Sequence, residues 1–465
     1  MRKILSLILT LTTLSFTQTY HKGLIFDDEA YQNIPKTAKL LTRDFESLPT
    51  AVSLQPYAPT VGSQGATGTC TAWATAYGAR TILESITNNR EYSPKTDSSV
   101  FSPSYVYNQI RTRQGCDGGT NIGRALDLIQ NQGVAKLSRF RFDCNKPITQ
   151  MDRNHASAYK IKDFKTLFSI NDTEKIQPVK KALSQKKPVI IGMRTPDSFD
   201  HAKQLWQPAQ GDYHQPNLGG HAMVVVGYDD NQEGGSFQLM NSWGKRWGED
   251  GFTWIRYSDF GHFVREAYEM IPNPPPQEPT RLGGALKFVD SNGNEMSATY
   301  SHNSNLYKMN QPYKTGTRFN FFIQNAQPAY LYAFGLDAQN KVSTIFPHDS
   351  RISAFLGYKN SSIAFPDEHS HIRMDNHIGK DYFIVLYSKE KLNIDAIKSS
   401  FANRQGSVRG RLRAVLGEGL IESGKINFSQ SMIKFNYDSG RGVKVKSKDS
   451  IIAVIIEFDH IGENR

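Results

Sequence analysis

Cys70 stands at the start of a predicted helix, where its thiol can serve as a nucleophile. It follows the stretch Gln64-Gly-Ala-Thr-Gly-Thr, and apolar residues recur behind it at helical spacing until Asn88-Asn89 interrupts the pattern. The positive end of a helix dipole favours the thiolate, which is the nucleophilic form of cysteine. A lone cysteine before a helix is more often inert, so this chemistry requires partners elsewhere in the chain.

His221, Asn241 and Gln64 are the candidate partners of Cys70. A thiolate nucleophile needs a base, a group that orients the base, and donors for the oxyanion. His221 lies in Gly219-Gly-His-Ala-Met, directly before a run typical of a buried strand. Asn241 begins the turn after the next strand, where its side-chain oxygen can accept from the imidazole. The side-chain amide of Gln64 can join the backbone N–H of Cys70 as an oxyanion donor.

The elements that must position these residues predict an α+β domain over residues 48–272. Helices are expected first, from Cys70 onward and over 101–110 and 121–132. Short, nearly continuous apolar runs then predict strands at 188–193, 222–228, 236–240 and 252–257. Helices followed by an antiparallel sheet indicate an α+β architecture.

The length of 465 residues favours two domains with linkers. Residues 18–47 are interpreted as a short pro-segment or N-terminal arm. The stretch 273–283 is rich in proline and is read as a semi-rigid linker. Residues 284–465 carry β-branched and aromatic runs that predict a mostly-β sandwich domain, with one helix near 394–403.

The first residues predict export. Met1-Arg2-Lys3 precedes an apolar run that ends at Phe16, which is the pattern of a cleavable signal peptide over residues 1–17. We therefore expect a secreted or periplasmic protein, with no membrane span, because this run is short and no later stretch is apolar enough. The formal net charge of +11 is scattered and no nucleic-acid motif is present, so a nucleic-acid partner is not expected.

No metal or organic cofactor is expected. His369, His371 and His377 lie close together in the second domain, but a solvated loop explains them better than a metal site.

The stretches 64–73, 115–119, 220–222 and 241–248 resemble the motifs of the papain family (C1-type) of cysteine peptidases, in order and in spacing. The resemblance covers residues 48–272 and implies a two-lobed domain with a helical left lobe and an antiparallel β right lobe. It implies the roles already outlined for the candidate residues: Cys70 as nucleophile, His221 as its imidazole partner, Asn241 as orienting residue and Gln64 as the oxyanion-hole glutamine.

The same resemblance implies which residues contact substrate. Trp243 matches the indole that shields the histidine–asparagine hydrogen bond from water. Gly118 and Gly119 match the glycines whose backbone pairs with an extended substrate. The second residue on the acyl side of the scissile bond should enter a roomy pocket, bordered by Thr120, Gly192 and Ala222.

Several positions depart from the family pattern. Thr67 stands where the family usually has a cysteine, so the usual disulfide to Cys116 cannot form, and we predict a Cys116–Cys144 pair instead. Thr71 replaces a tryptophan, and Gly220 replaces a residue that is often polar. Residues 18–47 are also shorter than the inhibitory propeptides of well-known members, so inhibition by that route is not expected.

The sequence thus predicts an exported cysteine endopeptidase that hydrolyses a peptide or protein substrate through an acyl-enzyme thioester. Two alternatives remain: a catalytically weak peptide- or cell-wall-binding protein with the same fold, and an exopeptidase or transpeptidase with the same residues. The second domain resembles, more weakly, a β-sandwich module of unknown function attached to bacterial peptidases and kinases. We expect that domain to bind a protein or cell-surface partner.

Overall fold

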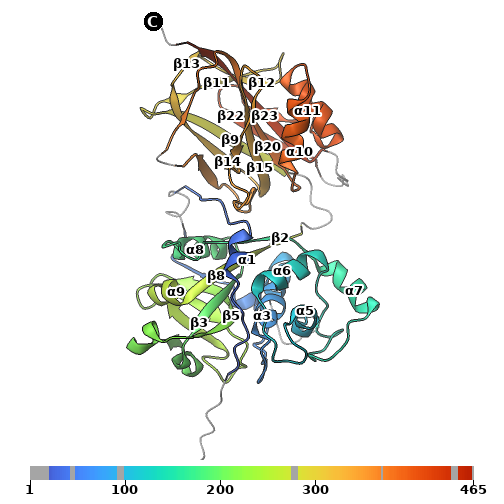
Figure 1. The fold of residues 1–465 in the computed structure, drawn as a ribbon, viewed down its shortest axis with the longest axis vertical. Helices are drawn as coiled ribbons and strands as arrows, with labels where there is room; N and C mark the ends of the chain where they lie inside the picture. Colours follow the sequence, from blue (N-terminus) through green and yellow to red (C-terminus); the bar gives the residue numbers. More distant parts are fainter. Residues whose placement is uncertain are drawn as a thin grey trace, which may run out of the picture.

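A computed structural model describes residues 20–41, 48–91, 99–273, 281–367, 370–440 and 449–462. It contains an α+β domain and a β-sandwich domain stacked along the long axis of the molecule (Figure 1). The predicted signal peptide, His369 and most of the proline-rich linker lie outside the described residues. Within these ranges, no helix combines the length and the apolar character that crossing a membrane requires.

The helical lobe of the α+β domain is built around the helix that begins at Cys70. This helix runs without a break through α3 (Cys70–Ala72), the π-helical η2 (Trp73–Arg80) and α4 (Thr81–Thr87), as predicted except for its π-helical middle. It packs closely on the sheet, since a Cβ atom on Gly78 would lie 2.8 Å from Val224. The lobe also contains α5 (Pro103–Ile110), α6 (Ile122–Asn131) and α7 (Gln150–Ala156).

Polar caps explain where two of the predicted helices begin. Ser102 and Asn121 precede α5 and α6, and each side chain accepts from a backbone N–H of the first turn. Gly133 follows α6 with φ of +86°, a conformation that ends helices and suits glycine. The predicted helices over 101–110 and 121–132 are therefore confirmed.

The β lobe is one mixed, mainly antiparallel sheet with the order β2-β8-β3-β5-β6-β7-β4, and β1 pairs with β5. Its strands are β1 (Ala51–Ser53), β2 (Ile161–Thr166), β3 (Val189–Thr195), β4 (Leu205–Trp206), β5 (Gly219–Asp229), β6 (Ser236–Met240), β7 (Phe252–Arg256) and β8 (Val264–Pro272). The four predicted strands are confirmed as β3, β5, β6 and β7. Helices α8 (Ile176–Ser184) and α9 (Tyr257–Phe263) pack against this sheet.

The sandwich domain pairs a seven-stranded sheet, β18-β14-β9-β22-β21 with β10 and β19 attached, with an eight-stranded sheet, β11-β12-β23-β20-β15-β16 with β13 and β17 attached. Phe288, Phe321, Phe383 and Phe458 fill the space between the sheets. The strands are β9 (Arg281–Asp290), β10 (Glu295–Met296), β11 (Ala298–Ser301), β12 (Leu306–Met309), β13 (Tyr313–Lys314), β14 (Arg318–Asn325), β15 (Ala329–Leu336), β16 (Val342–Phe346), β17 (Phe355–Leu356), β18 (Ser362–Phe365), β19 (Ile372–Arg373), β20 (Gly379–Ser388), β21 (Asn427–Phe428), β22 (Ile433–Asp438) and β23 (Ile451–Ile461).

A second apolar layer covers the outer face of the eight-stranded sheet. Helices α10 (Ile394–Ala402) and α11 (Val408–Leu416) place Phe401 and Leu412 against Phe334 and neighbouring strand residues. Helix α10 agrees with the helix predicted near 394–403, whereas α11 was not predicted.

A buried charge cluster joins the two domains. Glu269 on β8 is fully buried, and its Oε1 atom lies 3.1 Å from Lys165 Nζ and 3.2 Å from Lys187 Nζ. Its other oxygen accepts from the hydroxyl of Tyr358, in the sandwich, at 2.7 Å. Burial alone would raise the pKa of Glu269, yet the two lysines and this hydrogen bond lower it to about 2.

The N-terminal arm contacts both domains. Its helix α1 (Asp28–Asn33) precedes a stretch that exchanges backbone hydrogen bonds with the sandwich: Lys36 N–H to Arg351 O at 2.6 Å, and Ser353 N–H to Lys36 O at 2.7 Å. Ala38 and Leu40 are buried in the sandwich core. The C-terminal end of the arm is therefore anchored on the sandwich domain, and the chain then continues into the α+β domain from residue 48.

Candidate active site

Cys70 is the first residue of α3 and is fully buried. It is the free cysteine of the described residues, because Cys116 and Cys144 form a disulfide with a Cα–Cα distance of 5.4 Å. The predicted pairing is thus confirmed. Thr67, which takes the place of the family cysteine, uses its hydroxyl to donate to the carbonyl of Gln64 at 2.7 Å.

His221 and Asn241 meet as predicted. His221 lies on β5, Asn241 directly follows β6, and His221 Nε2 is 2.7 Å from Asn241 Oδ1. The asparagine oxygen can only accept, so this contact fixes the tautomer with the proton on Nε2. The indole of Trp243 stacks on the imidazole at 4.4 Å between ring centroids. The pair is therefore screened from water on that face.

The second imidazole nitrogen, His221 Nδ1, is buried and has no hydrogen-bond partner among the described residues. Fixing the proton on Nε2 leaves Nδ1 as the basic nitrogen. A base for a thiol is thus present, but the hydrogen bond between Cys70 and His221 is not formed in this state of the molecule.

Gln64 directs its side-chain amide toward the position predicted for an oxyanion. Its Oε1 atom accepts from the Ser242 hydroxyl at 2.7 Å, which leaves Nε2 to donate. Nε2 donates to the carbonyl of Thr67 at 2.6 Å and to the carbonyl of His21 at 3.0 Å. A carbonyl oxygen of the arm therefore already occupies this donor.

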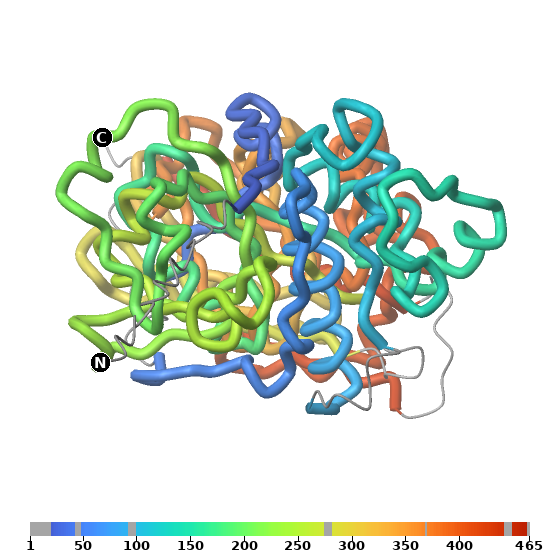
Figure 2. The backbone as a smooth tube through the Cα atoms, turned by 90° about the horizontal axis from the view of Figure 1, so that it is seen from below, coloured from blue at the N-terminus to red at the C-terminus, as the bar shows by residue number. Residues whose placement is uncertain are grey.

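The arm residues 20–26 cover the candidate site. The backbone N–H of Gly23 donates to Cys70 Sγ at 3.3 Å. Leu24 N–H donates to Gly220 O at 3.1 Å, while Thr120 N–H donates to Gly23 O at 3.0 Å. The arm thus pairs with both lobes, and Figure 1 shows it running down between them. Figure 2 shows the helix that begins at Cys70 between the β lobe and the other helices.

The arm runs against the direction expected of a substrate. Leu24 enters the predicted acyl-side pocket, since a Cβ atom on Gly192 would lie 2.9 Å from Leu24 Cδ2. In a substrate, the carbonyl at the oxyanion donor belongs to the residue just C-terminal to this pocket residue. Here that carbonyl belongs to His21, which is N-terminal to Leu24. Residues 18–47 are shorter than the inhibitory propeptides of the family, yet the extended segment 20–26 is enough to cover the site.

Burial makes both members of the candidate pair uncharged. Burial raises the pKa of the Cys70 thiol, although backbone N–H groups, including that of Gly23, oppose the rise. Burial also lowers the pKa of His221 to about 4, against the opposing effect of the Asn241 hydrogen bond. The covered site therefore holds a thiol and a neutral imidazole at neutral pH.

The predicted substrate-contacting residues are brought together, with one exception. Thr120, Gly192 and Ala222 border the cleft, and Gly119 lies under the arm, since a Cβ atom there would be 2.4 Å from Gly23 O. Gly118 faces away: its carbonyl accepts from the buried hydroxyl of Tyr107. The arm pairs with Thr120 instead of with Gly118 and Gly119.

Glu266, which is buried on β8 beside the acyl-side pocket, was not predicted as a site residue. A Cβ atom on Gly192 would lie 3.2 Å from its Oε2 atom, and the hydroxyl of Tyr268 donates to the same oxygen at 3.0 Å. Burial raises the pKa of Glu266 to about 7. Strand β8 itself was not predicted, so nothing in the sequence placed this acid at the cleft.

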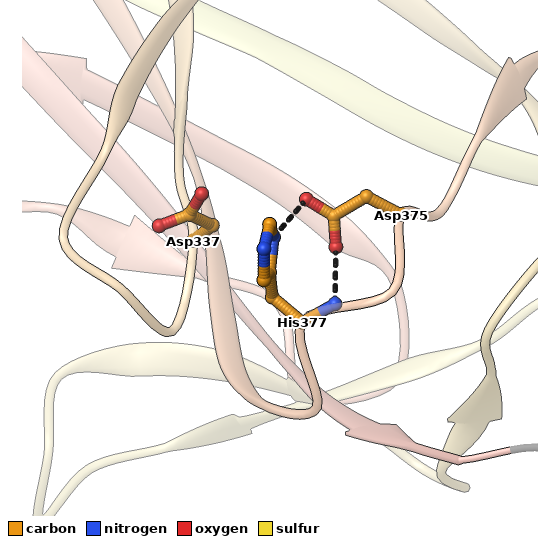
Figure 3. Close-up of side chains that lie close together, drawn as sticks. All are labelled: Asp337, Asp375 and His377. Atoms are coloured by element: carbon orange, nitrogen blue, oxygen red, sulfur yellow. Dashed lines mark hydrogen bonds and ion pairs between the residues drawn. The ribbon is translucent and has the colours of Figure 1, made fainter.

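A cluster of possible metal ligands lies far along the chain in the sandwich domain (Figure 3). The nearest ligand atoms of Asp337, Asp375 and His377 lie within 4.8 Å of one another. Asp375 accepts from the backbone and the imidazole of His377, and Asp337 accepts from backbone N–H groups of its own turn. Loop hydrogen bonds account for this arrangement, so we assign no metal to it.

A helix-start cysteine, a histidine oriented by asparagine and a glutamine amide donor form an arrangement that suits a thiol-dependent hydrolase. Residues 52–269 match the family model described as papain family cysteine protease. Residues 312–391 match a domain of unknown function, DUF4384.

Relatives of known sequence agree with this class. An uncharacterized peptidase C1-like protein, L477, of Acanthamoeba polyphaga mimivirus is 28% identical over 208 residues, which are 42% of this chain and 63% of the relative. Peptidase 1 of Dermatophagoides pteronyssinus is 29% identical over 149 residues, 31% of this chain and 43% of the relative. The chain thus spans less than two thirds of the length of either relative.

Among solved structures, xylellain, a cysteine protease from Xylella fastidiosa, is 22% identical with a TM-score of 0.45, covering 54% of this chain and 96% of that chain. The α+β domain of this chain is thus similar, over residues 52–269, to the papain family of cysteine proteases.

Proposed function

We propose that the chain is an exported cysteine endopeptidase that its own N-terminal arm keeps inactive. The observation that carries the proposal is the 2.7 Å contact between His221 and Asn241, which leaves the basic nitrogen of the imidazole unpaired in a cleft that also contains the thiol of Cys70. Burying His221 Nδ1 without a hydrogen-bond partner lowers the stability of the folded protein. The pair is therefore explained better by a chemical role than by a structural one.

Removal of the arm would expose Cys70 and His221 to water and to each other. Water stabilises both charged forms, so the proton of Cys70 can pass to His221 Nδ1 and give a thiolate and an imidazolium. Asn241 holds the ring in the required tautomer throughout. The covered and open states therefore differ in the charge of the pair.

In the open state the thiolate attacks the carbonyl carbon of a peptide bond. The carbonyl oxygen gains negative charge, which Gln64 Nε2 and the Cys70 backbone N–H stabilise by donating hydrogen bonds. The bond to the leaving nitrogen breaks as His221 gives that nitrogen its proton, and a thioester remains on Cys70. His221 then removes a proton from water, and the hydroxide attacks the carbonyl carbon of the thioester. The bond between this carbon and Cys70 Sγ breaks, the acid product leaves, and the Cys70 thiolate and the His221 imidazolium are restored.

The course of the arm supports an endopeptidase. The segment 20–26 passes through the cleft from Tyr20, stacked on Trp243 at 4.5 Å, to Phe26 beside Gly192. Gly23 contacts Cys70 in the middle of this segment, so the cleft accommodates three residues of extended chain on each side of the nucleophile. An exopeptidase would need a group that blocks one end of the cleft.

The proposal also includes the location of the protein and the role of the sandwich domain. The signal-peptide pattern of residues 1–17 supports a secreted or periplasmic location. We propose that the sandwich domain contributes to latency by holding residues 36–41 of the arm, and that its exposed surface binds a protein or cell-surface partner.

The test is to open the arm in the folded protein. A recognition sequence for a site-specific protease is inserted in the exposed stretch Asp27–Ala30, the arm is cut, and the released segment is removed by size-exclusion chromatography. Casein hydrolysis and labelling by an epoxide thiol probe are then measured before and after cutting, with Cys70→Ala and His221→Ala as controls. We expect activity and labelling only after cutting and only with both residues present. If the cut protein binds peptides but neither hydrolyses them nor is labelled preferentially at Cys70, the non-catalytic alternative is favoured.

A further inference from the structure

Lys22 and Leu24 lie on opposite sides of the candidate nucleophile. Strands β3 and β5 pair Gly192 with Ala222, Met193 with His221 and Thr195 with Gly219, so His221 lies between two pockets along the cleft. Leu24 packs beside Gly192, whereas Lys22 packs against Gly219, and Gly23 between them contacts Cys70. Because the Leu24 pocket takes the acyl side of a substrate, the Lys22 pocket takes the leaving-group side.

The Lys22 pocket is built for a long cationic side chain. The Lys22 ammonium donates to the carbonyl of Thr195 at 3.1 Å and lies 3.6 Å from Asp200 Oδ1 and 3.7 Å from Asp197 Oδ1. Its methylene groups cross Gly219, where a Cβ atom would lie 2.9 Å from Lys22 Cδ. A carbonyl and two carboxylates thus surround the charge, and a glycine makes room for the stem.

Asp200 is the member of this pocket that needs a cation. Its side chain is only 14% exposed, and its buried Oδ1 atom has no hydrogen-bond partner in the described part of the chain. The nearby Lys22 ammonium therefore offsets the cost of burying this negative charge. Burial raises the pKa of Asp200, and the charge of Lys22 opposes that rise. Asp197, by contrast, is 89% exposed and well solvated.

Aromatic packing fixes the position of Asp200 relative to the catalytic residues. Asp200 belongs to the 3-10 turn η5 (Asp197–His201), whose Phe199 is fully buried. Phe199 packs on Trp247 at 5.2 Å and on Trp243 at 5.9 Å between ring centroids, and Trp247 donates its indole N–H to Phe199 O. Trp243 in turn stacks on His221, so the carboxylate and the imidazole share one rigid support.

We propose that Asp200, assisted by Asp197, selects lysine or arginine as the first residue on the leaving-group side of the scissile bond, and that Lys22 of the arm occupies this subsite in the inactive state. This inference rests on the proposed peptidase function, of which it defines the substrate class. Gly219 and the Thr195 carbonyl complete the subsite.

The first test uses the cut and purified enzyme with internally quenched peptides. The peptides differ only in the residue after the scissile bond, which is lysine, arginine, norleucine or glutamate. We expect kcat/KM for lysine and arginine to exceed that for norleucine by at least about tenfold, as for a partly buried charge-assisted contact. Asp200→Asn should remove this difference, whereas Asp250→Asn, an exposed acid outside the pocket, should keep it.

The second test does not require catalysis. Synthetic peptides of residues 18–27, with lysine or norleucine at position 22, are titrated onto the opened Cys70→Ala protein, with and without Asp200→Asn. We expect the lysine peptide to bind about tenfold more tightly, and only when Asp200 is present. Equal binding of the two peptides, or a lysine preference that survives Asp200→Asn, overturns the inference. An opened protein that neither cuts peptides nor labels at Cys70 would instead contradict the peptidase function, while this binding difference still measures the subsite.

Discussion

The backbone N–H of Gly23 donates to the Sγ atom of Cys70 across 3.3 Å. A substrate would present a carbonyl carbon to the sulfur, whereas the arm presents a hydrogen-bond donor, which cannot be attacked. The reversed direction of the arm causes this difference, because it places the carbonyl of His21 at Gln64 while a different peptide group faces the thiol. The arm is therefore bound like a substrate and protected from cleavage at this point.

Leu24 should hold the arm in place more than its exposed neighbour does. Leu24 is 6% exposed in the acyl-side pocket, whereas Ile25 is 43% exposed. Leu24→Ala should cost the covered state about 2 kcal/mol or more of buried apolar contact, which raises the open population roughly 30-fold. The measurement is the rate of iodoacetamide labelling at Cys70 by mass spectrometry in the uncut protein. Ile25→Ala is the matched control, and equal rates for the two variants would contradict this role.

Gln64 should affect hydrolysis without affecting the reactivity of the thiol. In the opened enzyme, Gln64→Ala removes one of the two donors to the oxyanion, so kcat should fall by about 10²- to 10³-fold with little change in KM. Alkylation of Cys70 by iodoacetamide develops no oxyanion and should keep its rate. Steady-state kinetics and labelling on the same sample test both statements, and a parallel loss of the two rates would indicate a structural defect instead.

Local sequence was sufficient to predict which elements carry the candidate catalytic residues. Cys70 follows a turn that opens a helix, and His221 and Asn241 flank short apolar strands, so spacing along the chain places each on a defined element. The sandwich strands were predicted for the same reason, since runs such as residues 451–456 of β23 are apolar on both faces.

The path of the arm could not be predicted in this way. Tyr20, Gly23 and Leu24 form no periodic pattern, and their positions depend on pairing with Thr120 and Gly220, from two different lobes. The acids of the cleft were missed for a related reason. Asp200 and Glu266 are ordinary charged residues in the sequence, and only the fold brings Asp200 within 3.6 Å of Lys22 and Glu266 beside Gly192.

Acid should open the arm through His221. In the covered state its pKa is lowered to about 4, whereas an exposed histidine has a pKa near 6.5, so protonation favours the open state. The stability that the neutral imidazole gives the covered state is complete above pH 6.5 and is lost as the pH falls toward 4. Between these pH values the ratio of covered to open protein falls by up to about tenfold per pH unit. Glu266, with a pKa raised to about 7, contributes in the opposite sense, because its stabilisation is lost as the pH rises from about 4.5 to 7.

Hydrogen exchange of residues 20–26, corrected for the intrinsic rate at each pH, measures this opening. We expect corrected exchange to increase below pH 6.5 in Glu266→Gln, in which the opposing group is removed. The same variant with His221→Gln added should show little dependence on pH. A rise that persists without the imidazole would assign the acid response to other groups.

The Glu269 cluster should make the two domains unfold together. Glu269→Gln leaves Lys165 and Lys187 buried without their counter-charge, which should cost about 3–5 kcal/mol. Tyr358→Phe removes one hydrogen bond to the same carboxylate across the domain interface and should cost about 1–3 kcal/mol. Glu390→Gln is the matched control, because its contact with Lys162 also joins the domains but Glu390 is 64% exposed, so that its loss should cost less than about 1 kcal/mol.

Scanning calorimetry and urea unfolding at pH 7 measure these differences. The folded pKa of Glu269, about 2, lies below its ordinary value of 4.5, so its contribution is present at neutral pH and is lost as the pH falls below 4.5 toward 2. The gap between wild type and Glu269→Gln should therefore narrow in acid. Two separate transitions in wild type that are unchanged in Glu269→Gln would show that the domains unfold independently and that the cluster does not couple them.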